Sequence, residues 1–465
     1  MTLFKLRFYI AVLLCLFLRV CLAGARDSTE SDEGLWLSDG YGLLIEISKD
    51  GLQAFELTSI SCIPGWNAKR AQNSSGVGES VFVGNDTFRL SDGRSRDVKR
   101  LHLEGTASDM ILHRASARPA TCSQKPDNSA LVNYAIFWQT FAEQYAFFDL
   151  RHVDWQSVDR KFRPQAALAN TDKLFGILQQ MVEPLQDAHV GIYANDIKKD
   201  FDGWRKDPDH LEDEGWKKAQ DIIDTRYVRG GLRSFCNGRL QFGELDHSVG
   251  YLRITAFFGY VDPYTYERAL HQLQSALDSI FLGANKMNGL VIDVRLNHGG
   301  DDPLGIEIAS RLTNSRYLAY SKVTRNNLDG VLHFTDPQES WVVPSAHAGF
   351  HGDVVLLTGP DTVSAGETFT MALLGRKPHV TRVGLNTQGV FSDDLSRRLP
   401  NGWRFRLPNE VYLTSDGKAF DATGVPPDVR LSFFSPEDLQ KDRDAALEEA
   451  QKILAPLRDR HTGHP

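Results

Sequence analysis

Two segments of the chain carry residue types that could do chemistry on a carbonyl group. The first is DVVLLTGPDTVSAGE, residues 353–367, in which an apolar strand runs into a loop and Ser364 lies where a helix is expected to begin. A helix start offers free backbone N–H groups and a partial positive charge, which would stabilise an oxyanion beside a nucleophilic serine. A serine at this position also suits a simple helix cap. The segment therefore predicts Ser364 either as a nucleophile or as a cap.

The second segment is GLVIDVRLNHGG, residues 289–300, which ends in the pair Gly299-Gly300. Two glycines let a chain reverse after a buried strand. Their bare backbone could also approach a substrate carbonyl and donate an N–H to it. Asp293 ends the apolar run, and we expect it to organise the turn at 295–297 rather than to react.

The periodicity from residue 248 onward predicts the α/β element order that would position both segments. Apolar runs typical of buried strands alternate with amphipathic stretches typical of helices. The expected strands are VGYLRITAF, GLVIDVRL, DVVLLTG and HVTRVG, and the expected helices are PYTYERALHQLQSALDSIF, PLGIEIASRL and SAGETFTMALLG. Such alternation predicts a largely parallel sheet with helices on its faces. Functional groups in such sheets gather beyond the carboxyl ends of the strands, where both segments end.

Seven phrases in order resemble the C-terminal-processing, or tail-specific, peptidases, in particular their tricorn-like branch. The resemblance covers roughly residues 130–432, and the phrases read LQDAHVGIY, VGYLRITAF, LVIDVRLNHGG, TVSAGE, NTQGVFSD, LPNGWRFRLPN and FDATGVPPD. The resemblance implies a crotonase-like α/β core preceded by a helical cap. It also implies an exported serine endopeptidase, or C-terminal-processing-type peptidase, that hydrolyses peptide bonds.

The resemblance assigns a Ser-His-acid site. One branch of the family uses a lysine in a T-x-G-K phrase, but here that phrase ends in Val390. The tricorn-like layout instead implies His189 as general base and Asp421 as the acid that orients it, with Ser364 as nucleophile. An imidazole titrates near neutrality and can accept and return the serine proton. The backbone N–H groups of Gly300 and Ala365 would form the oxyanion hole.

Two positions depart from the tricorn pattern. Asp421 stands where Glu is usual, and Ala188 stands where tricorn has a serine before the histidine. Asp187, two residues before His189, is either a local orienting group or a carboxylate at a helix end.

The expected organisation has six parts. They are a signal peptide (1–25), an N-terminal β-rich domain (26–122), a helical cap carrying His189 (123–197), a connector (198–245), the crotonase-like core (246–434) and a C-terminal helix (435–465). The N-terminal domain reads as short antiparallel strands separated by turn residues. The C-terminal helix is expected to begin at Ser435-Pro436, a good N-cap followed by proline.

The first 25 residues favour export to a periplasm or to the outside of the cell. Lys5 and Arg7 precede an eleven-residue apolar run and a small-residue stretch, which is the order of a secretory signal. The run is short for a bilayer span, so no stable membrane insertion is expected after cleavage. The formal net charge is −8, and removal of residues 1–25 leaves 49 basic against 60 acidic residues. This acidity argues against a nucleic-acid partner, and a peptide or protein substrate is expected instead. The oligomeric state is unknown from the sequence.

Cysteine usage fits an exported chain. Cys62, Cys122 and Cys236 remain after the leader, and we favour a Cys62–Cys122 disulfide because both cysteines flank the β-rich region. No CxxC or HExxH occurs, so neither a metal site nor a cofactor is expected.

Two other classes of protein remain open. The same core resembles a retinoid-binding carrier of the retinal matrix, so the chain could bind a hydrophobic ligand or peptide with weak or no catalysis. A crotonase-type acyl-CoA enzyme would share the fold, but export argues against it and leaves His189 without a role. Covalent labelling of Ser364 would separate a peptidase from both alternatives.

Overall fold

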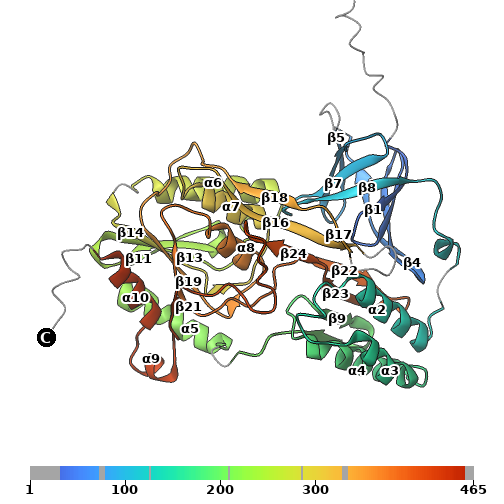
Figure 1. The fold of residues 1–465 in the computed structure, drawn as a ribbon. Helices are drawn as coiled ribbons and strands as arrows, with labels where there is room; N and C mark the ends of the chain where they lie inside the picture. Colours follow the sequence, from blue (N-terminus) through green and yellow to red (C-terminus); the bar gives the residue numbers. More distant parts are fainter. Residues whose placement is uncertain are drawn as a thin grey trace, which may run out of the picture.

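The computed structural model describes residues 32–72, 79–124, 127–207, 210–283, 286–326 and 333–455. The expected signal peptide, residues 1–25, lies outside this part of the chain. Figure 1 shows a β-barrel at the upper right, a group of helices below it, and an α/β unit on the left. The described helices include none that is long and apolar enough to cross a bilayer.

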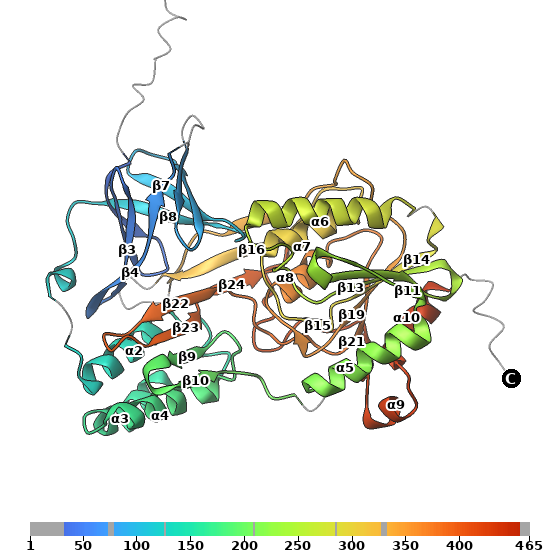
Figure 2. The ribbon, with the colours of Figure 1, turned by 180° about the vertical axis from the view of Figure 1, so that it is seen from behind.

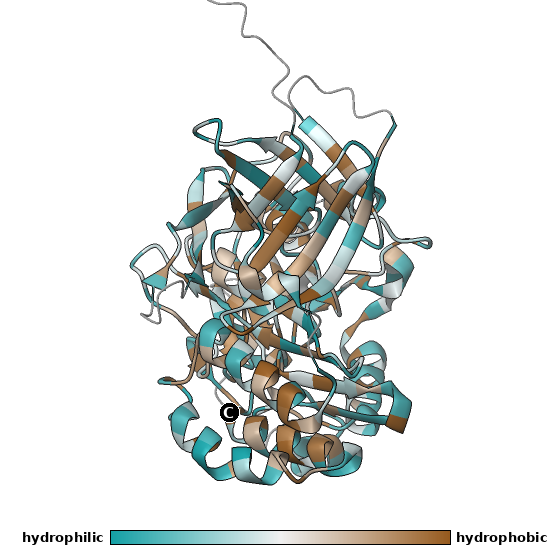
Figure 3. Ribbon diagram, turned by 90° about the vertical axis from the view of Figure 1, so that its right-hand side faces the viewer, coloured by the Kyte–Doolittle hydropathy of each residue, from teal (hydrophilic) through white to brown (hydrophobic). Residues whose placement is uncertain are grey.

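The N-terminal region is an eight-stranded antiparallel barrel, which confirms the expected antiparallel β domain. Strand β1 pairs with both β2 and β8, so the sheet closes on itself. The strands are β1 (Gly34–Ser38), β2 (Leu43–Ile47), β3 (Gly51–Thr58), β4 (Ser61–Arg70), β5 (Glu79–Val83), β6 (Thr87–Asp92), β7 (Val98–Leu103) and β8 (Asp109–Ala115). Polar and apolar residues alternate along them (Figure 3), as a half-buried strand requires.

The sequence between residues 80 and 90 reads as one strand but forms β5 and β6. The Gly84 N–H donates to the Asp86 carbonyl at 2.9 Å and turns the chain. The favoured disulfide is confirmed: Cys62 of β4 bonds Cys122, which lies in the short helix η1 (Ala120–Ser123). Cys236 is a buried free thiol.

Three helices follow the barrel, α2 (Ala130–Gln144), α3 (Trp155–Ala166) and α4 (Thr171–Val182). Their N-caps are Ser129, Asp154 and Asn170, and each side chain accepts a backbone N–H. The sequence analysis did not predict α3, although its buried residues Trp155, Phe162 and Ala166 lie at helical spacing. The stretch is otherwise polar and contains Pro164, which argues against a helix in sequence.

The main sheet has seven strands in the order β11-β12-β13-β14-β19-β21-β25. They are β11 (Arg229–Phe235), β12 (Leu240–Glu244), β13 (Val249–Ile254), β14 (Gly289–Asp293), β19 (Val354–Thr358), β21 (Thr381–Gly384) and β25 (Val429–Arg430). Pairing is parallel from β13 to β25, and β11 and β12 add antiparallel strands at one edge.

Part of the stretch expected as a connector, 198–245, therefore belongs to this sheet. Strand β11 is mostly exposed and reads RGGLRSF, so it lacks the apolar alternation that marks a strand in sequence. Only pairing with β12 reveals it.

Helices cover both faces of the sheet (Figure 2). One face packs in a common core with α6 (Tyr266–Phe281), α7 (Asp302–Ser310) and α8 (Ala365–Ala372). The other face packs with α5 (Asp213–Ile222) and α10 (Ala445–Leu454).

A smaller sheet joins the helical region to the rest of the molecule. Its order is β10-β9-β23-β22, so the hairpin of β9 (Gly191–Ala194) and β10 (Lys199–Asp202) pairs with β23 (Arg404–Pro408) and β22 (Asp394–Arg398). Strand β24 (Glu410–Leu413) follows β23 and pairs with β16 (Tyr317–Asn326), which also pairs with β17 (His333–Phe334) and β18 (Gln338–Val342). The turn that carries His189 is thereby fixed against segments two hundred residues later.

The expected C-terminal helix is two helices. Ser435 caps α9 (Pro436–Gln440) as expected, but the chain breaks and restarts at α10. The break lets Asp444 turn inward, where it caps α10 and pairs with the fully buried Arg295. Asp293 bonds the same guanidinium and the Arg295 N–H, which confirms its expected organising role.

Candidate active site

Ser364 occupies a strained turn between a short strand and a helix. The chain leaves β19, forms β20 (Asp361–Thr362), and reaches Ser364 just before α8. Ser364 has φ 55° and ψ −121°, and its side chain makes no capping hydrogen bond. Helix caps adopt extended backbone angles, whereas a non-glycine residue at positive φ stores strain. The geometry therefore differs from that of a capping serine.

Two short strands hold the glycine pair against this turn. Strand β15 (Leu296–Asn297) pairs in parallel with β20, and the Val363 N–H donates to the Asn297 carbonyl at 2.9 Å. The buried Asn297 side chain accepts from the Gly299 N–H and donates to the Ile254 carbonyl. Gly299 and Gly300 have φ 87° and φ 133°, so both need glycine's conformational freedom.

The two N–H groups expected in the oxyanion hole flank this turn. Gly300 forms an isolated parallel bridge with Phe257. In that bridge the hydrogen bonds involve the Gly299 carbonyl and the Asp301 N–H. Ala365 is the first residue of α8, where a helix has no internal acceptor for its N–H. Within the described residues, neither the Gly300 nor the Ala365 N–H donates a hydrogen bond.

His189 lies in a buried turn between the helical region and β9. Its exposed fraction is 7 %, and its Nδ1 is buried with no hydrogen-bond partner in the described chain. Asp187 shapes the turn: one carboxylate oxygen accepts from the His189 N–H, and the other accepts from the Tyr145 hydroxyl and pairs with Arg151. Asp187 thus fixes the His189 backbone and makes no bond to its ring.

Asp421 is 3 % exposed, and neither of its carboxylate oxygens has a described partner. Burial, together with the nearby Glu367 and Asp187 carboxylates, raises its pKa well above the ordinary value. The loop position is fixed by the Ala422 N–H, which donates to the Gly389 carbonyl at 2.8 Å.

Glu367 is a site residue that sequence reasoning missed, although it stands three residues after Ser364 in the phrase SAGE. It is fully buried and accepts from the Thr387 hydroxyl and from the Gly389 and Val390 N–H groups. The Val390 carbonyl in turn accepts from the Ser364 N–H at 3.1 Å. Burial raises the pKa of Glu367 to about 7, against the three hydrogen bonds that lower it.

The segment after β10 crosses the same region and was expected only as connector. Arg205 donates to Gln388 and to the Thr387 carbonyl, and the His210 ring bonds Asp361. Trp204 packs with a small apolar cluster of Ala188, Val363 and Val390. This cluster places the residue before His189 against the residue before Ser364.

The structure thus brings the segments that carry Ser364, His189 and Asp421 into one region, but no described hydrogen bond connects the three side chains. Ala188 packs against Val363, and Asp421 lies within electrostatic range of Asp187 and Glu367. No hydrogen bond joins Ser364, His189 and Asp421 among the described residues. The described part of the chain also holds no group of three or more side chains placed to bind a metal ion.

Family models match the chain over this region. The model for peptidase family S41 matches residues 248–431, and the model for the tricorn protease C1 domain matches residues 126–183. The first range contains Ser364, Gly300 and Asp421, and the second covers the helices that precede His189.

Two curated proteins are similar in sequence. A carboxy-terminal-processing protease of Bartonella bacilliformis is 24% identical over 212 residues, and a chloroplastic carboxyl-terminal-processing peptidase 2 of Arabidopsis thaliana is 26% identical over 203 residues. Each match covers 44% of this chain. The matched part spans only 44% and 35% of those proteins' own lengths.

Solved structures extend the likeness to the fold. A peptidase candidate from Parabacteroides merdae is 25% identical with a TM-score of 0.61, and the match covers 72% of this chain and all of that one. Mature CPAF is 11% identical with a TM-score of 0.52, covering 72% of this chain and 98% of that one. The second likeness concerns the fold alone.

Proposed function

Because the chain belongs to peptidase family S41, the C-terminal processing peptidases, we propose that it is an exported serine peptidase that cleaves peptide bonds with Ser364 as nucleophile. The observation that carries the proposal is the Ser364 backbone at φ 55° with no capping hydrogen bond. Strain of this kind costs about 1–3 kcal/mol and persists where the surroundings enforce it. A sharp strand-to-helix turn is the arrangement that exposes a nucleophilic hydroxyl above a sheet.

The Gly300 and Ala365 N–H groups form the oxyanion hole in this proposal. Both flank Ser364, and neither donates to another described residue. Groups fixed in advance need no reorganisation when the carbonyl oxygen becomes charged, so they favour the transition state over the substrate.

His189 acts as the general base and Asp421 as its orienting acid. His189 takes the Ser364 proton during attack and returns it to the leaving amine. The buried Nδ1 of His189 and both buried oxygens of Asp421 have no described partner, and a bond between them would satisfy both groups. Since catalytic hydrogen bonds are often absent without substrate, we assign this bond to the substrate-bound state.

The core is crotonase-like and the helices α2 to α4 form its cap in this proposal. Export is supported by the Cys62–Cys122 disulfide, because disulfides persist mainly in oxidising compartments. The substrate is a peptide or protein, as the family implies.

Labelling with a fluorophosphonate probe tests the proposal. We expect one equivalent of label on the folded protein, and none on Ser364→Ala or His189→Ala. Ser435→Ala is the matched control, because Ser435 is a true helix cap whose side chain accepts from the Asp438 N–H. Failure of the folded wild-type protein to react would reject the peptidase and favour a carrier on the same fold.

A further inference from the structure

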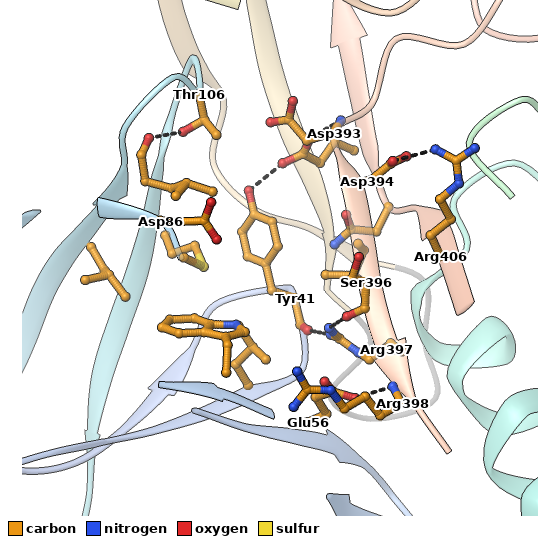
Figure 4. A pocket seen from close by; sticks show the side chains of 18 of the residues that line it. Tyr41, Glu56, Asp86, Thr106, Asp393, Asp394, Ser396, Arg397, Arg398 and Arg406 are labelled. Carbon is orange, nitrogen blue, oxygen red and sulfur yellow. Dashed lines mark hydrogen bonds and ion pairs between the residues drawn. The ribbon is translucent and has the colours of Figure 1, made fainter. Parts of the chain in front are cut away.

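A cavity of about 540 Å³ lies between the N-terminal barrel and β22 (Figure 4). We infer that this cavity binds an extended, uncharged stretch of polypeptide with an apolar or aromatic side chain seated against Trp66. The inference rests on the proposed function, because the bound polypeptide is the substrate of the peptidase. The cavity is a second binding site for that substrate, separate from Ser364.

A buried amide without partners points to a peptide ligand. Asn409 lines the cavity and is 1 % exposed, yet neither its Oδ1 nor its Nδ2 has a described hydrogen-bond partner. Its backbone is held by Arg325 and Ser392, so the residue is fixed in place. A buried amide left unpaired costs about 1–3 kcal/mol. One donor beside one acceptor matches the C=O and N–H of a peptide backbone.

Strand β22 supplies a second backbone-recognising feature, because it is an edge strand and all of its residues line the cavity. The Leu399 N–H donates to the Trp403 carbonyl of the neighbouring segment. Because backbone groups alternate in direction along an antiparallel strand, the N–H and C=O groups of Leu395 and Arg397 point toward β23. Those of Ser396 and Arg398 point away from β23. The Arg398 N–H indeed donates to Glu56 of the barrel, across the cavity. The Ser396 carbonyl accepts from the Arg397 guanidinium, so the Ser396 N–H and the Arg398 carbonyl are the outward-facing groups without a described partner. These groups can bond an extended peptide that is added at the strand edge.

Much of the opposite wall is apolar. Six side chains that belong to the barrel core or pack against it line the cavity there: Leu43, Trp66, Phe88, Leu101, Leu103 and Met110. The barrel also contributes the polar side chains of Asn85, Asp86, Thr106 and Ser108. Trp66 stacks on Phe88 with ring centroids 4.3 Å apart, which forms a flat aromatic floor. Such a wall favours an apolar or aromatic side chain.

The charges around the cavity favour an uncharged segment. Five basic and five acidic side chains line it, and Lys322, for example, pairs with both Asp393 and Glu410. A lining without net charge gives no advantage to a free carboxylate or another ion. The bound segment is therefore an internal stretch of a chain rather than its charged end.

The cavity is linked to the candidate active site by a short stretch of backbone and by a hydrogen bond. Asp394 at the start of β22 is four positions after Val390, whose carbonyl accepts from the Ser364 N–H. That is at most about 14 Å of extended chain. Arg406 lines the cavity and donates to the carbonyl of Ala188, the residue before His189. One substrate chain can therefore occupy both places.

Binding of fluorescein-labelled β-casein, an unfolded protein, to the uncleaving Ser364→Ala protein tests the inference by fluorescence anisotropy. We expect Trp66→Ala and Asn409→Leu, each added to Ser364→Ala, to weaken binding about 10-fold. A capped octapeptide of alternating Ser and Phe should compete, and its Ser and Ala counterpart should not. Trp341→Ala is the matched control, since Trp341 is also half-buried, packs on Arg316 and lies outside the cavity.

The outcomes separate this inference from the proposed function. Unchanged affinity in both cavity variants would overturn the inference and leave the cavity as a solvent-filled space. An equal loss in Trp341→Ala would overturn it too, because the effect would then be general. Asn409→Leu keeps side-chain volume, so it remains informative if Trp66→Ala does not fold. Fluorophosphonate labelling, done on proteins that retain Ser364, measures only the reactivity of that serine. Casein binding without labelling would therefore reject the peptidase and keep the binding site.

Discussion

Gly299 lies directly against Ser364: a methyl group on Gly299 would sit 2.6 Å from the Ser364 Cβ and 3.1 Å from its Oγ. The absence of a side chain at Gly299 is thus what allows the serine to occupy its turn. Its φ of 87° imposes the same requirement independently.

Replacing Gly299 with alanine should push Ser364 out of position. We expect Gly299→Ala to slow fluorophosphonate labelling about 100-fold, since a displacement of about 1 Å has that effect on aligned groups. Gly402→Ala is the control, because Gly402 also has a positive φ, 90°, but its added methyl group meets nothing within 4 Å. Equal labelling rates in the two variants would contradict the contact argument.

Replacing Ser364 should separate strain from chemistry. Ser364→Ala and Ser364→Gly should both lose labelling. Glycine adopts φ 55° freely, so we expect Ser364→Gly to unfold with a free energy about 1 kcal/mol higher than Ser364→Ala. Urea denaturation measures the difference. A less stable glycine variant would show that the turn is not strained.

Stability should depend on pH through Glu367. Its pKa is raised from 4.5 to about 7 in the folded protein, so the unfolded chain releases this proton first as pH rises. Ionisation therefore favours the unfolded state, and the contribution of Glu367 to the free energy of unfolding falls between pH 4.5 and 7.

The fall should be about 3 kcal/mol at 1.36 kcal/mol per pKa unit. Asp421, whose pKa is also raised, contributes a fall of its own in both proteins. Urea unfolding at a series of pH values should therefore show a fall that is smaller by about 3 kcal/mol in Glu367→Gln than in the wild-type protein. Glu339→Gln, at an exposed position, should keep the wild-type profile. Identical profiles for the wild-type protein and Glu367→Gln would contradict the prediction.

Breaking the buried pair at the C-terminus should destabilise the core. Arg295 is fully buried between Asp293 and Asp444 and stacks on Phe433 and Phe434. Asp444→Ala leaves the buried Arg295 guanidinium with one carboxylate partner instead of two. Such a change lowers the free energy of unfolding by about 3–5 kcal/mol. Glu449→Ala, in the same helix, removes an exposed pair with Lys452 and should cost under about 1 kcal/mol. Equal unfolding free energies for the two variants would refute the difference.

Local sequence patterns determined the elements around the nucleophile. Apolar runs predicted β13, β14, β19 and β21, and the switch to helical periodicity predicted α6, α7 and α8. These signals are local, because the side-chain period of a strand or helix is complete within a few residues. The position of Ser364 at the start of α8 followed from the same patterns.

Weakly patterned elements could not be found in this way. Strand β11 exposes most of its residues, so it shows no apolar alternation. Pairing with β12 stabilises it, and such tertiary contacts leave no period in the sequence. Helix α3 has its three buried residues at helical spacing, but the stretch is otherwise polar and contains Pro164.

The sequence by itself thus determined the strand-turn-helix unit that holds Ser364 and the glycine pair opposite it, since backbone geometry and short-range periodicity specify such units. Only the tertiary structure decided what surrounds them. The Arg295–Asp444 pair joins residues 149 apart, and the Arg406–Ala188 contact joins residues 218 apart. The cavity beside Trp66 exists because the barrel packs near β22, a strand that follows Trp66 by more than three hundred residues. Contacts over such separations depend on how whole elements pack, which no local pattern records.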